Sequence, residues 1–254
     1  MLELANKGAL LIGSKRIGSI IGHRLAAEGM NLGIVYRKSR TAAEQLYRDV
    51  TPMTKRICLL QGDMGVEADV KRVIELALQE LEGLSFIINL ASEYPKNPFH
   101  TLTTKEWDES MNAAKASYLL SVHGARTMMN NPGPTRGHII LFSDWAAKNT
   151  PYRDYVPYLT SKAAIDFMTR AFAVELAPHG ILVNAIAPGP TIRPRGISKR
   201  NWEQNVVGQT PLTRESSAED ISEMVITLLK SETITGETIR IDSGRHLAGP
   251  NAKV

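Results

Sequence analysis

The residues best suited to chemistry in this sequence are Tyr158 and Lys162, which lie four apart at the start of an apolar helical segment. Residues four apart share one face of a helix, so the ammonium group can lie beside the phenol. A neighbouring cation favours the phenolate and lowers the pKa of a tyrosine from its ordinary value of about 10. Such a pair can act as a general acid and base near neutral pH. The spacing also occurs by chance in amphipathic helices, so its meaning depends on the other motifs.

A turn that contains glycine follows the first apolar run of the chain, residues 8–12. Glycine lets the backbone approach a ligand closely, and the N-terminus of the next helix attracts a pyrophosphate. A plain strand-to-helix turn also contains glycine, so it is the position after the first strand that favours a dinucleotide. The candidate binding residues are Gly13, Ser14, Lys15, Arg16, Ile17 and Gly18.

The end of the second strand indicates which dinucleotide binds. A carboxylate about twenty residues beyond the glycine turn usually holds the ribose hydroxyls of NAD. This chain has Arg37, Lys38 and Ser39 there instead. Guanidinium and ammonium groups suit a 2′-phosphate, so the turn favours NADP(H), although a solvated basic turn has the same composition.

Strand-like runs alternate with helical patterns along the chain. This alternation predicts a single Rossmann-type doubly wound α/β domain over residues 1–254, a seven-stranded parallel sheet with helices on both faces. Residues 188–217 have little periodicity, and we expect a mobile substrate loop there. The predicted strands are 8–12, 31–36, 56–60, 84–90, 137–143, 181–187 and 238–241. The predicted helices are 17–28, 41–49, 67–82, 104–129, 158–178 and 218–230.

Composition excludes several classes of protein. The net charge of +4 comes from scattered basic residues, which argues against a nucleic-acid partner. No apolar run has the length of a membrane span and no signal-peptide pattern is present. Cys58 is the only cysteine, so we expect a reducing, cytoplasmic setting. The six histidines show no metal-ligand spacing, and we predict no metal site.

Six motifs in order resemble the short-chain dehydrogenase/reductase family over nearly the whole chain. Besides the glycine turn and the Tyr158/Lys162 pair, they include Asn89-Leu90-Ala91-Ser92 and a C-terminal Ile241-Asp242-Ser243-Gly244. The resemblance implies that Tyr158 protonates the acceptor and that Lys162 lowers its pKa and holds the nicotinamide ribose. It also implies that NADP(H) is contacted by Asp63, Met64, Asn89, Ala91, Ser92, Tyr158, Lys162, Pro188, Gly189 and Thr191.

Departures from the common family pattern resemble its pteridine and dihydromonapterin reductase branch. Asp144 stands where most members have the second of two serines, fourteen residues before Tyr158. Lys15-Arg16, Tyr94-Pro95 and the tail Gly244-Arg245-His246-Leu247 are similar to the same branch. We expect Asp144 to orient or protonate the substrate, with Ser143 as the alternative if the register shifts by one residue.

Other candidates each have two interpretations. We expect Tyr94 and Trp145 to line the substrate pocket, although tryptophans such as Trp145 and Trp202 are more often packing residues. Tyr152 and Tyr155 are interpreted as loop residues. The family's relay asparagine aligns with Ala113, and Asn112 is adjacent, so participation of Asn112 stays open. A further group is interpreted as a solvated charged face or as a site that meets an anionic substrate: Arg193, Arg195, Lys199 and Arg200.

The resemblance implies an NADP(H)-dependent oxidoreductase that transfers hydride to a C=O or C=N group. The acceptor is a 3-oxoacyl thioester carried on acyl carrier protein, or a pterin-like small molecule. One alternative is an enoyl-thioester reductase, because Tyr155 lies seven residues before Lys162. Another is a non-catalytic dinucleotide-binding sensor, for which a phenol of lowered pKa has no use. The family also implies a homo-oligomer, a dimer or tetramer.

Overall fold

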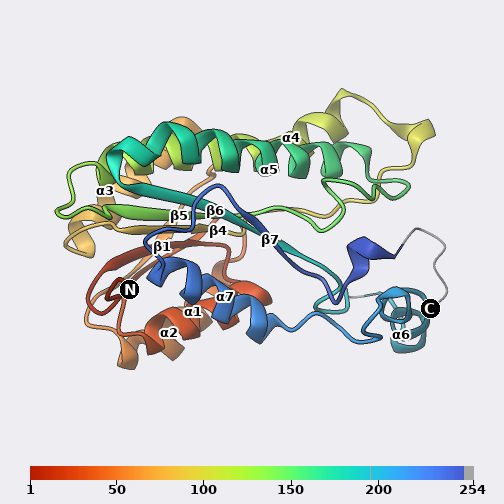
Figure 1. Ribbon diagram of the computed structural model, residues 1–254, viewed down its shortest axis with the longest axis horizontal. Coiled ribbons are helices and arrows are strands. Elements are labelled where there is room, and N and C mark those ends of the chain that lie inside the picture. Colours follow the sequence, from red (N-terminus) through yellow and green to blue (C-terminus); the bar gives the residue numbers. More distant parts are fainter. Residues whose placement is uncertain (195, 249–254) are drawn as a thin grey trace.

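A parallel β-sheet forms the centre of the protein (Figure 1). The computed structural model describes residues 1–194 and 196–248. Within these residues the strands are β1 (Gly8–Ile12), β2 (Asn31–Tyr36), β3 (Ile57–Gln61), β4 (Phe86–Asn89), β5 (Gly137–Phe142), β6 (Ile181–Pro188) and β7 (Thr238–Ile241). They form one seven-stranded sheet in the order β3-β2-β1-β4-β5-β6-β7. The order reverses between β1 and β4, and ligands bind at such a reversal, beyond the carboxyl ends of the strands.

Helices cover both faces of the sheet (Figure 1). On one face lie α1 (Ile17–Ala27), α2 (Arg40–Val50) and α7 (Ala218–Lys230), and on the other lie α3 (Glu67–Glu80), α4 (Thr104–Met128) and α5 (Val156–Leu176). Strand β1 shows why both faces are covered, because Leu10 packs into one apolar core and Leu11 into the other. Both side chains are fully buried, which requires a protein layer on each side. The predicted fold class is confirmed.

The predicted boundaries differ from the observed ones by one or two residues at several helix and strand ends. Helix α5 begins at Val156 rather than at Tyr158, because Pro157 is well suited to a first helical turn. It ends at Leu176, and Gly180 in the left-handed conformation (φ 68°) then leads into β6. The predicted loop over 188–217 contains the short helix α6 (Lys199–Asn205), capped by the Ser198 side chain. Of the charged residues predicted in this loop, Arg195 lies outside the described residues.

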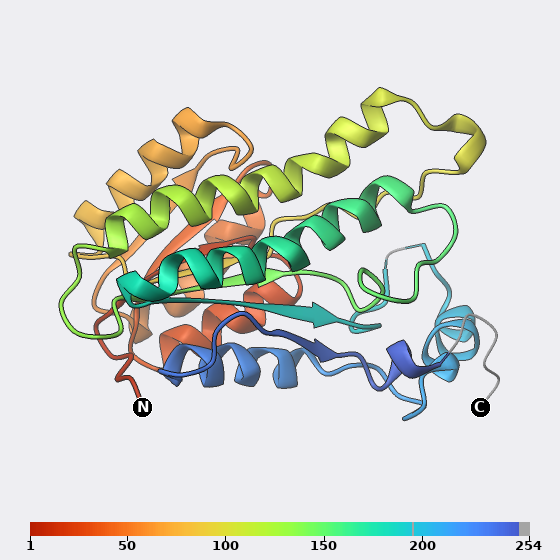
Figure 2. The ribbon, with the colours of Figure 1, turned by 45° about the horizontal axis from the view of Figure 1, so that its top comes forward.

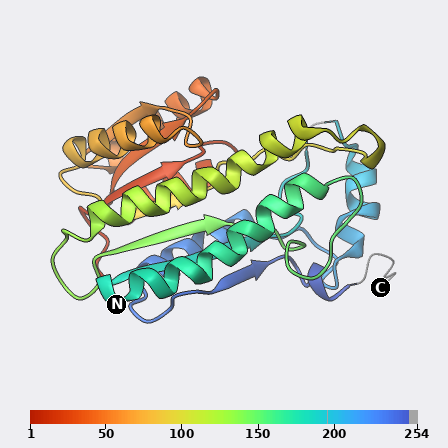
Figure 3. The ribbon, with the colours of Figure 1, turned by 90° about the horizontal axis from the view of Figure 1, so that it is seen from above.

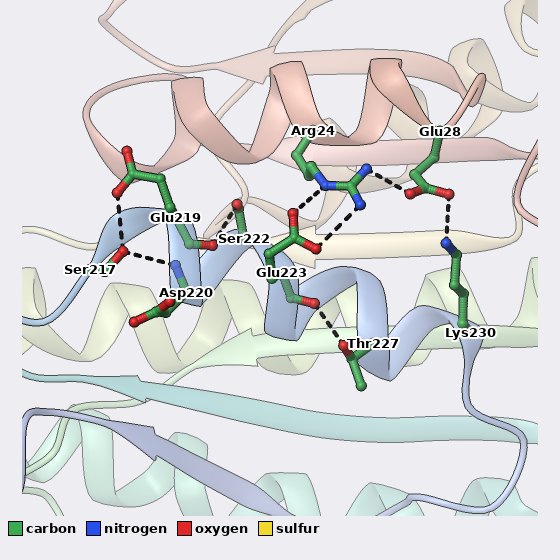
Figure 4. A network of polar contacts seen from close by, with 9 residues as sticks. All are labelled: Arg24, Glu28, Ser217, Glu219, Asp220, Ser222, Glu223, Thr227 and Lys230. Atoms are coloured by element: carbon green, nitrogen blue, oxygen red, sulfur yellow. Dashed lines mark hydrogen bonds and ion pairs between the residues drawn. The ribbon is translucent and has the colours of Figure 1, made fainter.

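Ion pairs fasten α7 to α1, as Figure 4 shows. The guanidinium of Arg24 on α1 bonds the carboxylates of Glu28 and Glu223, and Lys230 Nζ lies 2.8 Å from Glu28 Oε2. The hydrogen bond from Lys230, together with that from Arg24, holds the pKa of Glu28 below its ordinary value despite partial burial. At the start of α7, the Ser217 hydroxyl accepts a hydrogen bond from the Asp220 amide. These contacts hold α7 against α1, and so they fix the position at which the segment after β6 ends.

The long helices α4 and α5 and the short helix α6 complete the arrangement around the sheet. Helices α4 and α5 lie side by side over one face (Figure 3). The chain after β6 leads to α6, which lies near the 3-10 turn Arg245–Leu247 at the carboxyl end of the sheet (Figure 2). Among the described residues, none of the helices has the length and apolar character needed to span a membrane.

Candidate active site

A cavity of about 1250 Å³ opens at the carboxyl ends of the strands. It is lined by the segments that follow β1 to β6, together with parts of α4, α5 and α6. Every site residue predicted from the sequence lines it except Asn89. Asn89 is buried beside it, where its amide donates to the Ser117 hydroxyl at 3.1 Å and its oxygen accepts the Ala91 amide at 3.1 Å. The structure therefore brings the predicted residues into one place.

The turn after β1 has the close backbone geometry of a ligand-binding loop. The Gly18 amide donates to the Lys15 carbonyl at 2.9 Å, and a Cβ on Gly18 would lie 2.0 Å from the Gly13 oxygen. Arg16 therefore sits at the second position of a tight turn with φ 55° and ψ −117°, a conformation that favours glycine. Its guanidinium reaches the segment after β6 and donates to the Ile192 carbonyl.

The basic turn after β2 is engaged by carboxylates. Arg37 Nη1 lies 3.3 Å from Asp63 Oδ2 after β3, and Nη2 bonds Glu93 after β4. Lys38 is exposed, and Ser39 stands at the N-cap position of α2. A bound phosphate would compete with these carboxylates for the Arg37 guanidinium.

Tyr158 and Asp144 are in direct contact in the wall of the cavity. The phenol donates a 2.8 Å hydrogen bond to Asp144 Oδ2. Lys162 Nζ lies 5.7 Å from the centre of the Tyr158 ring and donates to the Phe142 carbonyl at 2.8 Å. Ser143 is directed elsewhere, since its hydroxyl donates to the Lys162 carbonyl at 3.1 Å. Asp144, rather than Ser143, is thus the partner of the phenol.

The electrostatics of this cluster correct one expectation from the sequence. Burial, and then the nearby Asp144 carboxylate, raise the pKa of Tyr158 well above its ordinary value. The predicted lowering by Lys162 is absent, because the phenol bonds a carboxyl group and the ammonium bonds a carbonyl. Burial also raises the pKa of Asp144 and lowers the pKa of Lys162 to about 8. All three groups are therefore shifted toward their neutral forms.

Aromatic side chains form one wall of the cavity around Tyr158. Tyr94 meets the Tyr158 ring edge to face, with 4.9 Å between ring centres, and stacks on Tyr155 at 4.5 Å. Tyr152 stacks on Trp145 with 5.8 Å between ring centres. Tyr94, Trp145 and Tyr152 line the cavity, whereas Tyr155 lies behind them. This wall can bind a flat apolar or aromatic ligand.

The side chain of Asn112 makes its contacts with the segment that follows β3. Its amide donates to Asp63 Oδ1 at 3.4 Å, and its oxygen packs so tightly on Gly65 that a Cβ there would lie 1.9 Å away. Ala113, which aligns with the family's relay asparagine, has no side-chain donor. The described contacts thus give Asn112 a place beside Asp63 rather than a bond to Lys162.

The segment after β6 closes the opposite side of the cavity. Gly189 packs on the backbone of Asp242, where a Cβ would lie 2.5 Å from its Cα. The Thr191 hydroxyl donates to the Gly189 carbonyl at 3.0 Å, and Pro188 also lines the cavity. The predicted charged residues of this segment that are described are exposed to solvent: Arg193, Lys199 and Arg200.

Comparison with known proteins identifies the family. Residues 12–246 match the sequence family described as Enoyl-(Acyl carrier protein) reductase. A short-chain dehydrogenase from Burkholderia cenocepacia, solved in complex with NADP, is 26% identical and covers 99% of this chain and 100% of its own, with a TM-score of 0.86. The chain therefore belongs to this family of short-chain dehydrogenases/reductases.

Two further relatives support the assignment of this chain to the short-chain dehydrogenases/reductases. The FolM alternative dihydrofolate reductase 1 from Brucella suis, also solved with NADP, is 27% identical with a TM-score of 0.87. The match covers 96% of this chain and 97% of that one. The uncharacterized oxidoreductase YohF from Escherichia coli is 28% identical over 92% of this chain and 93% of its own. The family inferred from the motifs is confirmed.

Several lining residues of this family member were not predicted as site residues from the sequence, among them Tyr152, Trp202 and Arg245. Tyr152 was interpreted as a loop residue, and Trp202 on α6 as a packing residue. Arg245 appeared only within a tail motif, yet it lies in the cavity. Trp202 and Arg245 lie far along the chain from α5, and Tyr152 lies in the irregular segment before it, so none of them is part of a periodic pattern with Tyr158. The aromatic run of Trp145, Tyr152, Tyr155 and Tyr158 was the one available hint.

Proposed function

We propose that this protein is an NADP(H)-dependent reductase that transfers hydride to a C=O or C=N group of a small molecule. The observation that carries the proposal is the contact between Tyr158 and Asp144 beside Lys162, inside a cavity that also contains the glycine turn. A proton donor and a dinucleotide-type turn in one cavity suit hydride transfer followed by protonation. Similar structures solved with NADP are consistent with this choice of cofactor.

The residues of the glycine turn fit a bound dinucleotide. The Ser14 hydroxyl is buried and has no hydrogen-bond partner among the described protein atoms, so it is available to a ligand. Gly18 permits close backbone approach at the N-terminus of α1, which suits a pyrophosphate. Lys15, Lys38 and, once released by its carboxylates, Arg37 supply positive charge for a 2′-phosphate. The other proposed contacts are Gly13, Arg16, Ile17, Ser39, Asp63, Met64, Asn89, Ala91, Ser92, Pro188, Gly189 and Thr191.

Side chains of this protein supply the proton that the reduced acceptor takes up. NADPH, when bound, supplies the hydride. Because its pKa is raised, Tyr158 is protonated at neutral pH, and the oxygen or nitrogen that hydride transfer leaves anionic is a strong enough base to take that proton. Asp144, with a raised pKa, can donate a hydrogen bond to the acceptor when protonated. Lys162 can return a proton to the site near neutral pH and hold the nicotinamide ribose. Ser143 orients the helix that carries Lys162, through the carbonyl of that residue.

Two acceptor classes are compatible with this arrangement. A pterin-like ring suits the flat wall formed by Tyr94, Trp145 and Tyr152. FolM is described as a dihydrofolate reductase, which agrees with such a ring. A 3-oxoacyl thioester carried on acyl carrier protein also presents a carbonyl, and its chain would extend along the same wall. The pterin-like acceptor is the one that the aromatic wall favours.

An enoyl-thioester reductase is the second candidate, favoured by the description of the matching family. It requires Tyr155 to act with Lys162. In the structure Tyr155 stacks on Tyr94 outside the lining of the cavity, while Tyr158 lies inside it. The geometry therefore favours carbonyl or imine reduction.

Steady-state oxidation of NADPH tests the proposed function. The acceptors are a dihydropterin, an acetoacetyl thioester, an enoyl thioester and a quinone. Turnover of the first two supports the proposal, and turnover of the enoyl thioester alone supports the second candidate. If NADPH binds but no acceptor is turned over, the protein is a dinucleotide-binding sensor and the proposal is wrong.

A homo-oligomer is also part of the proposal. Apolar and aromatic side chains are exposed on the outer surfaces of α4 and α5, which lie side by side (Figure 3). Tyr118 is 50% exposed, Phe167 65% and Val174 75%. Exposed apolar and aromatic side chains on two adjacent helices suit contact with a second copy. Light scattering in solution measures the state directly.

A further inference from the structure

Arg245 is a buried charge in the wall of the cavity. Its residue surface is only 8% exposed, and it lines the cavity together with Asp144 and Trp145. The guanidinium carbon lies 4.9 Å from the centre of the Trp145 ring. Stacking on an aromatic face orients the guanidinium plane and leaves its edge free for hydrogen bonds.

Among the described residues, the hydrogen-bond partners of Arg245 are neutral. Nη1 donates to the Ala248 carbonyl at 3.0 Å, and Nη2 donates to Gln209 Oε1 at 2.6 Å. Within residues 1–194 and 196–248, Arg245 forms no ion pair with a carboxylate. The nearest acid in sequence, Asp242, instead bonds His246. Burial lowers the pKa of Arg245 from its ordinary value, and the charge of Asp242 opposes this only in part.

An unneutralised guanidinium in such a place favours a negative ligand. A guanidinium carries five N–H donors, and the two bonds above use two of them. A buried charge without an opposite charge is costly, and an anionic oxygen that reaches it removes much of that cost. The Arg245 guanidinium is already fixed before a ligand binds, by its bonds to Gln209 and Ala248 and by the Trp145 ring. This reduces the conformational entropy lost on binding.

We propose that Arg245 is the specificity-determining residue of this site and that it selects acceptors bearing an anionic oxygen on the Trp145 side. The anionic oxygen is a carboxylate or an ionised ring hydroxyl. This inference rests on the proposed reductase function and narrows its substrate class. A neutral ring could stack on the same wall, but it would leave the charge of Arg245 unpaired.

Two matched pairs of carbonyl compounds test the inference and distinguish the two sources of charge. Benzoylformate and its methyl ester differ in one carboxylate charge. 2-Hydroxy-1,4-naphthoquinone, which is ionised at neutral pH, and its methyl ether differ in one ring-oxygen charge. For each compound, kcat/KM with NADPH and the dissociation constant from the complex with NADP⁺ are measured in wild type, Arg245→Met, Arg245→Lys and Arg240→Met.

In wild type the anionic member of at least one pair should be preferred. Arg245→Met should lower the ratio of anionic to methylated compound by about tenfold or more, the size expected for a charge-assisted hydrogen bond. Arg245→Lys should retain part of the preference, because the charge stays but the planar fork is lost. Arg240→Met, in β7 and outside the cavity lining, should leave the ratio unchanged.

Retained turnover of the methylated compounds shows that Arg245→Met is folded. The inference is overturned if the ratio in Arg245→Met equals that of wild type, or if wild type prefers the methylated member of both pairs. Absence of turnover for all four compounds and also for the dihydropterin and the acetoacetyl thioester would instead refute the reductase function. The dissociation constants still decide the role of Arg245 in that case.

Discussion

The phenol of Tyr158 donates a 2.8 Å hydrogen bond to Asp144 Oδ2, and both groups lie in the wall of one cavity. Burial raises the pKa of both groups, and the Asp144 carboxylate raises the pKa of Tyr158 further, so the cluster holds protons that a reaction can use. Titrations of such a coupled pair belong to the pair rather than to either residue. The function of the site is thus expected to depend on how these two groups share a proton with Lys162.

The first prediction distinguishes the two tyrosines. Tyr158→Phe removes the proton and keeps the packing, so carbonyl reduction should fall by about 100-fold or more while NADPH still binds. Tyr155→Phe should change kcat by less than about threefold, because that ring lies behind the cavity lining. Stopped-flow reduction and NADPH fluorescence titration measure both effects. An essential Tyr155 with a dispensable Tyr158 would instead support the enoyl-thioester reductase.

The second prediction concerns the protonation of Asp144. Its pKa is raised, so the protonated form persists to higher pH than for an ordinary aspartate, and activity should fall as pH rises through that pKa. Asp144→Ser should keep simple ketone reduction and lose most pterin reduction, and Asp144→Ala should damage both. The measurement is a pH–rate profile of the three proteins with one ketone and one dihydropterin. Full activity of Asp144→Ala on every substrate would make the residue structural.

Local patterns explain how much of this fold could be predicted from the sequence. Strand β1 and the glycine turn are continuous in the chain, and Tyr158 and Lys162 lie four apart on one helix. Each of these depends on neighbours in sequence, so periodicity and spacing were sufficient. The pairing of Asp144 with Tyr158 came from family resemblance and not from periodicity.

The parts of the site that could not be predicted depend on contacts between distant segments. Arg37 bonds Glu93, 56 positions away, and Arg245 stacks on Trp145, which lies on another loop. The direction of the Lys162 ammonium was also not predictable, because it depends on the Phe142 carbonyl at the end of β5. A helix pattern places a side chain on a face, but the surrounding strands decide which partner it meets.

The third prediction tests the choice of cofactor. Arg37→Asp combined with Lys38→Ala removes the cations placed for a 2′-phosphate, so NADPH affinity should fall by about tenfold or more and NADH affinity should change little. Arg40→Ala is the matched control, since it removes an exposed cation that pairs with Glu44 on the next turn. Calorimetric dissociation constants measure the effect. Equal binding of NADH and NADPH by wild type would contradict the interpretation of this turn.

The fourth prediction follows from the carboxylates that hold Arg37. Glu93 is largely exposed and bonds the same guanidinium that a 2′-phosphate would use. Glu93→Gln should therefore tighten NADPH by about two- to fivefold, the range of exposed ion pairs, without changing NADH affinity. The effect should vanish in an Arg37→Met background. Weaker NADPH binding by Glu93→Gln would show that the carboxylate helps to shape the site instead.

The last prediction concerns acid stability and His138 in β5. This side chain is fully buried beside Phe86, and neither ring nitrogen has a hydrogen-bond partner among the described protein atoms. Burial lowers its pKa from 6.5 to about 4. On acidification the unfolded state therefore binds this proton at a higher pH than the folded state does. The stability that the neutral His138 contributes is complete above pH 6.5 and is lost as the pH falls toward 4.

A shift of this size corresponds to roughly 3 kcal/mol of unfolding free energy across that window. His138→Leu removes the titrating group at similar volume, so urea unfolding should show a smaller loss of stability than in wild type between pH 7 and pH 4.5. Exposed His100→Gln is the control and should reproduce the wild-type dependence. Carboxylates with lowered pKa, such as Asp63 and Asp166, are present in both proteins, so their titration does not produce the difference. Parallel pH profiles for wild type and His138→Leu would show that His138 is not the group whose protonation opposes folding.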